Sequence, residues 1–139
     1  MSGNTISVIS KRSFDFSKLQ SSQTQEIPLN RAIDVTGAKQ IDLVVRVHSR
    51  TISSGQIDVI AQAVSLSNED PSVDFIYTTN ASGVIALATL TLNVTAPCLQ
   101  LAQLTAPWGP MVRVILKGTG AASATIQASL SIDLIVYSN

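Results

Sequence analysis

Histidine, cysteine and carboxylate side chains are few in this chain of 139 residues, and they are the groups that could carry chemistry. The only histidine, His48, lies between Arg46 and Arg50 and next to Ser49, where a neutral imidazole could act as base for a hydroxyl nucleophile. The Gly-x-Ser-x-Gly turn that presents a nucleophilic serine in one large hydrolase class is absent from the sequence. We therefore predict that the chain is not an enzyme and that His48 is an exposed or interfacial strand residue.

Metal and cofactor sites are not predicted either. Cys98 and His48 are the only residues of their types and do not make a zinc ligand set. Glu69, Asp70 and Asp74 surround a turn, but they lack the spacing of a calcium loop, so a solvated turn is the better interpretation. No glycine-rich loop precedes a helical pattern, and the two glutamates fall in expected loops, where nothing fixes a pair for glycoside hydrolysis.

The elements that must position any site are strands, because apolar and polar residues alternate along most of the chain. The expected strands are 40–50, 56–66, 84–94, 111–117 and 123–137. The last exceeds the usual strand length, so we expect a bend or bulge in it, or a passage between sheets. The turn residues at 53–55 and 118–120 predict two hairpins. This spacing of strands and turns predicts an all-β fold, an antiparallel β-sandwich that is jelly-roll-like.

The first 30 residues follow a different pattern. Phe14 and Phe16 form an apolar island before a stretch rich in Ser, Gln and Thr. We predict that residues 1–30 are a polar N-terminal arm or edge segment, either an edge strand with a loop or an arm that orders on a partner. Residues 31–139 are then the sandwich domain, and Phe14 and Phe16 are candidate partner-binding residues.

Charge is scarce on this chain, since only 13% of residues are charged and nine basic residues balance nine acidic ones. No basic excess is available to neutralise phosphates, so nucleic acid is not an expected partner. No apolar run approaches the ~18 residues that cross a membrane, and residues 1–10 lack a secretory pattern. A surface with so few charges favours contact with other protein.

The best group of polar residues on one predicted strand face consists of Arg46, His48 and Arg50, together with Asp42. It could engage an acidic or carbonyl-rich partner surface, or it could be a solvated face that blunts lateral pairing. Trp108, in a Pro-Gly corner, is a further candidate contact residue. As an alternative function, Trp108, Tyr77 and Asp74 near a loop end would suit a carbohydrate- or receptor-binding module of a virion or cell-surface assembly.

A strand of Gly109, Val112, Arg113 and Val114, a Thr119-Gly120 turn and an alternating run from Ala124 to Val136 make up the C-terminal part. This pattern resembles the C-terminal hairpin of small β-sandwich virion proteins of tailed bacteriophages, the capsid decoration, cement and related auxiliary head proteins. The resemblance covers residues 108–136 and leaves residues 1–35 unaligned.

The resemblance implies a non-enzymatic structural protein that binds and stabilises a phage capsid, without cofactors. Its partners would be the major capsid protein and neighbouring copies of itself, in a trimer or dimer, with no nucleic acid and no membrane. It would be made in the host cytoplasm and lie on the capsid exterior. The scarcity of charge and the absence of a catalytic set agree with that expectation.

Overall fold

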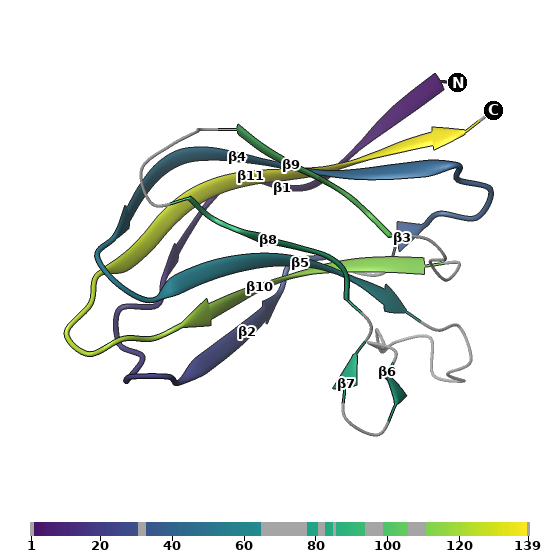
Figure 1. Ribbon diagram of the computed structural model, residues 1–139. Helices are drawn as coiled ribbons and strands as arrows, with labels where there is room; N and C mark the ends of the chain where they lie inside the picture. The colour runs from purple at the N-terminus through teal and green to yellow at the C-terminus, as the bar shows by residue number, and fades with distance from the viewer. Residues whose placement is uncertain are drawn as a thin grey trace.

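Two antiparallel β-sheets packed face to face make up the body of the protein (Figure 1). The computed structural model describes residues 2–30, 33–64, 78–80, 83–84, 86–93, 99–105 and 111–138. Within these ranges every regular element is a strand, and none is a helix that could span a membrane. The predicted all-β antiparallel sandwich is confirmed.

Sheet A has four strands in the order β1-β11-β4-β9, namely β1 (Ser2–Asp15), β11 (Ile126–Ser138), β4 (Gln40–Ile52) and β9 (Leu99–Gln103). The long strand β11 runs between β1 and β4, and the two chain ends lie together where Ser2 pairs with Ser138 (Figure 1). In β11 the even-numbered residues from Ile126 to Leu134 are buried, as the alternation predicts. This places its odd-numbered residues on the face turned away from sheet B.

Sheet B has five strands: β2 (Thr24–Pro28), β10 (Met111–Thr119), β5 (Gln56–Val64) and β8 (Ala86–Thr91) in that order, with β3 (Ile33–Asp34) also paired to β10. A separate two-stranded ribbon is formed by β6 (Thr78–Asn80) and β7 (Gly83–Val84). The sequence predicted a single strand at 84–94, whereas the structure has β7 and β8 there and ends β8 at Thr91.

The core lies between the two sheets and is aliphatic, with one large aromatic ring, Phe16, fully buried. Its largest fully buried side chains are Phe16, Ile41, Leu43, Ile57, Leu104, Leu116, Ile126, Leu130, Ile132, Leu134 and Val35. Strand β10 is buried on both faces, so that even Arg113, which alternates with the core residues Val112 and Val114, is only 6% exposed. Alternation identifies two faces of a strand, but it does not tell whether the polar face is covered.

The two predicted hairpins are also wrong. The turn at 53–55 leads from β4 in sheet A to β5 in sheet B, and the turn after Thr119 leads from β10 in sheet B to β11 in sheet A. Both connections therefore cross the sandwich, and each strand pairs with partners distant in sequence. The two connections contact one another, since the Ser53 amide donates to the Thr125 carbonyl (2.9 Å) and the Thr125 amide donates to Ser53 Oγ (2.9 Å).

The first 30 residues belong to the sandwich. Strand β1 pairs with β11 along the edge of sheet A, and β2 pairs with β10 along the edge of sheet B. Residues 2–30 are thus an edge strand of each sheet joined by a loop, rather than an arm that stands apart from them.

Candidate functional site

The outer face of sheet A, the face turned away from sheet B, carries the candidate residues Arg46 and His48. Antiparallel partners point to the same side of a sheet, so the register arranges their side chains in rows across the strands. One row joins Ser131, Arg46 and Leu99, and the next joins Asp133, Val44 and Leu101.

Arg46 and His48 are exposed on this outer face, but Arg50 is not on the same side of the strand. Ser49 pairs with Ser129 and Val47 pairs with Leu130, which leaves His48 as an extra residue in β4. Such a bulge reverses the side-chain parity beyond it, and Arg50 is in register with the buried Ala128. The prediction that Arg46, His48 and Arg50 share one face is therefore wrong for Arg50.

A hydrogen-bonded group centred on Ser131 joins three strands on this face. Ser131 Oγ accepts the Lys11 amide at 2.9 Å and lies 2.7 Å from His48 Nε2. Lys11, with φ of 46°, lies in a register shift of β1, opposite the bulge at His48 in β4. Because Ser131 accepts the Lys11 N–H, its own proton can go to His48 Nε2. The histidine thus contacts Ser131 rather than its sequence neighbour Ser49.

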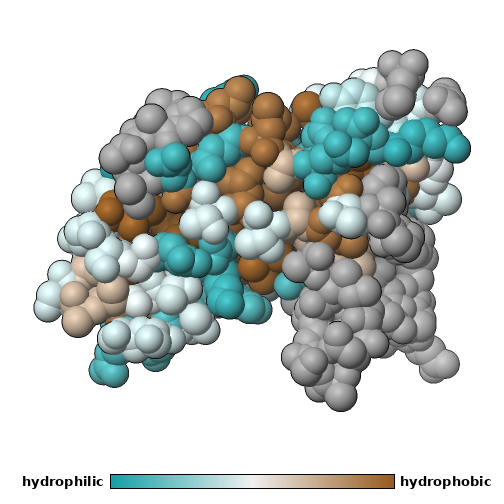
Figure 2. Space-filling model, in the orientation of Figure 1, coloured by the Kyte–Doolittle hydropathy of each residue, from teal (hydrophilic) through white to brown (hydrophobic). Residues whose placement is uncertain are grey.

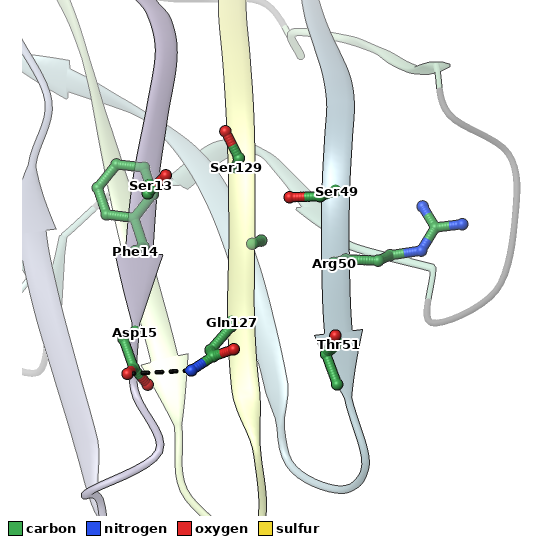
Figure 3. Close-up of a pocket in the computed structure, with 9 residues that line it drawn as sticks. Ser13, Phe14, Asp15, Ser49, Arg50, Thr51, Gln127 and Ser129 are labelled. Atoms are coloured by element: carbon green, nitrogen blue, oxygen red, sulfur yellow. Dashed lines mark hydrogen bonds between the residues drawn. The ribbon is translucent and has the colours of Figure 1, made fainter.

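A groove of about 320 Å³ adjoins this group on the same face (Figure 3). It is lined by Ser13, Phe14, Asp15, Ser49, Arg50, Thr51, Gln127, Ala128 and Ser129. Figure 3 shows two rows of polar side chains, one of Ser13, Ser129 and Ser49 and one of Asp15, Gln127 and Thr51. We call this surface the serine groove. Its floor offers small neutral hydrogen-bonding groups, with the Arg50 side chain directed away from it.

One carboxylate, Asp15, is held at the end of the serine groove. Its Oδ1 accepts the Ser17 amide at 2.8 Å and its Oδ2 accepts Gln127 Nε2 at 3.2 Å. The pKa of Asp15 is lowered mainly by hydrogen bonds from the Ser17 side chain and backbone, and further by Gln127. The carboxylate therefore stays ionised and fixes one border of the groove.

The two phenylalanines proposed as contact residues are buried in the chain's own core. Phe16 is 1% exposed and Phe14 is 6% exposed, with the Arg12 guanidinium 5.1 Å from the Phe14 ring centre. Both side chains pack behind β1, because Phe14 is in register with the buried Ala128. Both rings are thus almost fully covered within the chain itself, and a contact role for Phe14 and Phe16 stays a prediction.

The remaining candidates lie outside the described residues. These are Trp108, Tyr77 and Asp74 of the carbohydrate alternative, together with Glu69, Asp70 and Cys98. In the part of the chain that the structure describes, no group of three or more His, Cys, Asp and Glu residues could hold a metal ion.

Two exposed leucines on the outer face are not among the candidate residues predicted from the sequence. Leu99 is 47% exposed and Leu101 is 64% exposed, and they are the exposed large hydrophobic residues of the described ranges. They alternate with Gln100 and Ala102 on the edge strand β9, so the leucines stand on the outward side of that strand. The serine groove had no such signal, because Ser13, Ser49 and Ser129 meet only through the register of three strands.

The fold and this surface define a jelly-roll-like β-sandwich whose candidate site is an open sheet face. No protein-family model matches the chain, and no curated protein matches it. Among solved structures, a chain in the structure of infectious bursal disease virus, Gx strain, is similar with a TM-score of 0.54 and 12% identity. That comparison covers 97% of this chain and 31% of the viral chain, so this protein spans about a third of its length.

Two further structures are similar at lower scores. The Gt strain of infectious bursal disease virus gives a TM-score of 0.53 at 12% identity, again over 97% of this chain and 31% of that one. A chain of the disulfide-linked pili of Bacillus endospore appendages gives 0.41 at 9% identity, over 100% of this chain and 93% of that one. At these identities the likeness to the viral chains establishes the fold, a jelly-roll-like sandwich, and no more.

Proposed function

We propose that this chain is a structural virion protein that binds and stabilises the capsid shell of a tailed bacteriophage from outside, as a decoration or cement protein. The observation that carries the proposal is the serine groove, an open part of the outer face of sheet A that is lined by neutral hydroxyl groups. Such a face suits a broad protein partner better than a small substrate, which needs an enclosing pocket. The similarity of its fold to chains in the structures of a virus supports the same class, that of structural virion proteins.

The mechanism is mechanical. Each copy would lie across neighbouring shell subunits, and repetition over the lattice would multiply a modest local free energy. Serine and threonine hydroxyls lose less solvation free energy on burial than charged groups do. The serine groove can therefore bond to the carbonyl and amide groups of the major capsid protein at little desolvation cost, while Asp15 fixes orientation at its border.

Co-sedimentation tests this contact. The purified chain is mixed with shells of the major capsid protein encoded in the same genome, and saturable binding in fixed stoichiometry is expected. Ser49→Arg places a long charged side chain in the exposed groove and should weaken binding at least about tenfold, or about 1.4 kcal/mol. The matched variant Thr24→Arg, exposed on the edge strand of sheet B, should bind like the wild type.

Two results would contradict the proposal. One is a wild-type chain that stays in the supernatant at every shell concentration, and the other is equal loss of binding in Ser49→Arg and Thr24→Arg. A glycan array separates the alternative of a carbohydrate-binding module, which is favoured if specific, saturable binding is lost on Trp108→Ala.

A further inference from the structure

Leu99 and Leu101 extend the apolar surface of sheet A onto its solvent side. They are two residues apart on β9, where Leu99 is in register with Arg46 of β4 and Leu101 is in register with Val44. Val44, on the same outer face, is only 8% exposed, so the exposed apolar area belongs mainly to the two leucines. Figure 2 shows hydrophobic side chains gathered at the top of the view over the region of β9, beside hydrophilic ones. We call the rows around these leucines the leucine face.

Charges of opposite sign border the leucine face at its two ends along the strands. Asp42 of β4 and Asp133 of β11 lie on the side of Leu101, whereas Arg46 and His48 lie on the side of Leu99. Asp42 and Arg46 are four residues apart in one strand, or about 13 Å, so they do not pair within the chain. Along the strand direction, the acidic side chains therefore lie on the Leu101 half of the face and the basic side chains on the Leu99 half.

This order is complementary to itself when reversed. A two-fold axis that crosses the strands midway between the Leu99 and Leu101 rows turns one copy over onto another. Leu99 then faces the partner's Leu101, and Asp42 faces the partner's His48. Arg46 falls between the partner's Asp42 and Asp133, because those two residues flank the partner's Val44.

We propose that the leucine face is the contact between two copies of this chain in a two-fold symmetric dimer. A second copy fits because the same patch supplies both halves of an isologous contact, with leucines against leucines and acids against bases. The formal net charge of zero leaves no long-range repulsion between copies. The inference rests on the proposed function in that a lattice-bound protein acts beside its own copies, but it is tested without any shell.

Sedimentation velocity of the full chain over a range of concentrations tests the dimer. The wild type should shift from monomer to dimer, and Leu101→Ser should raise the dimer Kd at least about tenfold. Asp42→Arg and Arg46→Asp should each weaken the dimer by bringing like charges together across the axis. The double variant should bind more tightly than either single variant, because the exchange restores opposite charges between positions 42 and 46 of the two copies. It should stay weaker than the wild type, because the contacts of these positions with the partner's His48 and the partner's Asp133 remain reversed in charge. Glu26→Arg makes the same charge change on β2 of sheet B and should leave the Kd unchanged.

A wild-type chain that is monomeric up to about 100 µM would overturn the dimer, as would a trimer. Dimers as tight in Leu101→Ser as in the wild type would show that another surface is used. A double variant as weak as the weaker single variant would exclude the two-fold arrangement. Urea denaturation of each variant separates loss of the dimer from loss of folding. Co-sedimentation of the wild type and Ser49→Arg with shells tests the proposed function, whereas sedimentation velocity without shells tests the dimer. The two proposals can therefore fail separately.

Discussion

Phe16→Ala is expected to lower the free energy of unfolding by about 3–5 kcal/mol, the range for removal of a buried aromatic side chain. Phe16 is 1% exposed, and its amide donates to the Ile126 carbonyl at 2.8 Å, so its ring is held between the end of β1 and the start of β11. The ring lies directly against Gly118 of β10, where a Cβ would overlap it. The expected loss is measured by urea denaturation with Phe16→Leu as a milder second variant.

The contact between Phe16 and Gly118 also predicts coupling between the two sites. Gly118→Ala should destabilise the wild type because the new methyl group meets the Phe16 ring, and it should cost much less in the Phe16→Ala background. Leu134→Ala, near the other end of β11, serves as the control and should add to Gly118→Ala within about 0.5 kcal/mol. Additive effects of Phe16→Ala and Gly118→Ala would contradict the packing of β1 against β10.

Gly55→Ala is expected to lower the free energy of unfolding by about 2–5 kcal/mol, the second large effect. Gly55 has a φ of 76°, a conformation that costs an L-residue about 1–2 kcal/mol. A Cβ there would also lie 2.5 Å from the Thr119 carbonyl oxygen and 2.7 Å from Ile126 Cδ1, and relieving such overpacking costs about 1–3 kcal/mol more. The result follows from the crossing connections, which bring the turn after β4 against the end of β10.

Gly37 separates the two contributions to this effect. Its φ is 84°, but a Cβ at Gly37 would meet nothing within 4 Å. Gly37→Ala should therefore cost only the conformational part, about 1–2 kcal/mol. Equal losses in Gly37→Ala and Gly55→Ala, measured by thermal or urea unfolding, would contradict the close approach of residues 55 and 119.

Strand positions could be predicted from the alternation of residues, whereas strand partners could not. The predicted strands at 40–50 and 111–117 are found with ends that differ by up to two residues, and that at 123–137 begins three residues later because a turn holds Ser123 at a φ of 56°. Short turns such as those at 53–55 and 118–120 favour a hairpin between the two strands that they join. The structure instead pairs β11 with β1 and β4. This pairing depends on which side chains are buried between the two sheets, and no local sequence pattern shows that.

The candidate site was only partly predictable for a similar reason. Arg46 and His48 lie on the outer face as predicted, but the bulge at His48 moves Arg50 to the other side of the strand. Neither a glycine nor any other local signal marks that bulge. The polar neighbours of Phe14 and Phe16 favour a contact role for them, although alternation at positions 14 and 16 equally fits an edge strand with a buried side.

The central claim is that this chain is a stoichiometric part of a virion. Its most direct test is quantitative mass spectrometry of particles purified by density gradient from cells that carry the gene, with the chain measured against the major shell protein. We predict a constant ratio across the particle peak that survives repeated banding. Absence of the chain from the peak, or a ratio that falls with each round of purification, would contradict the claim.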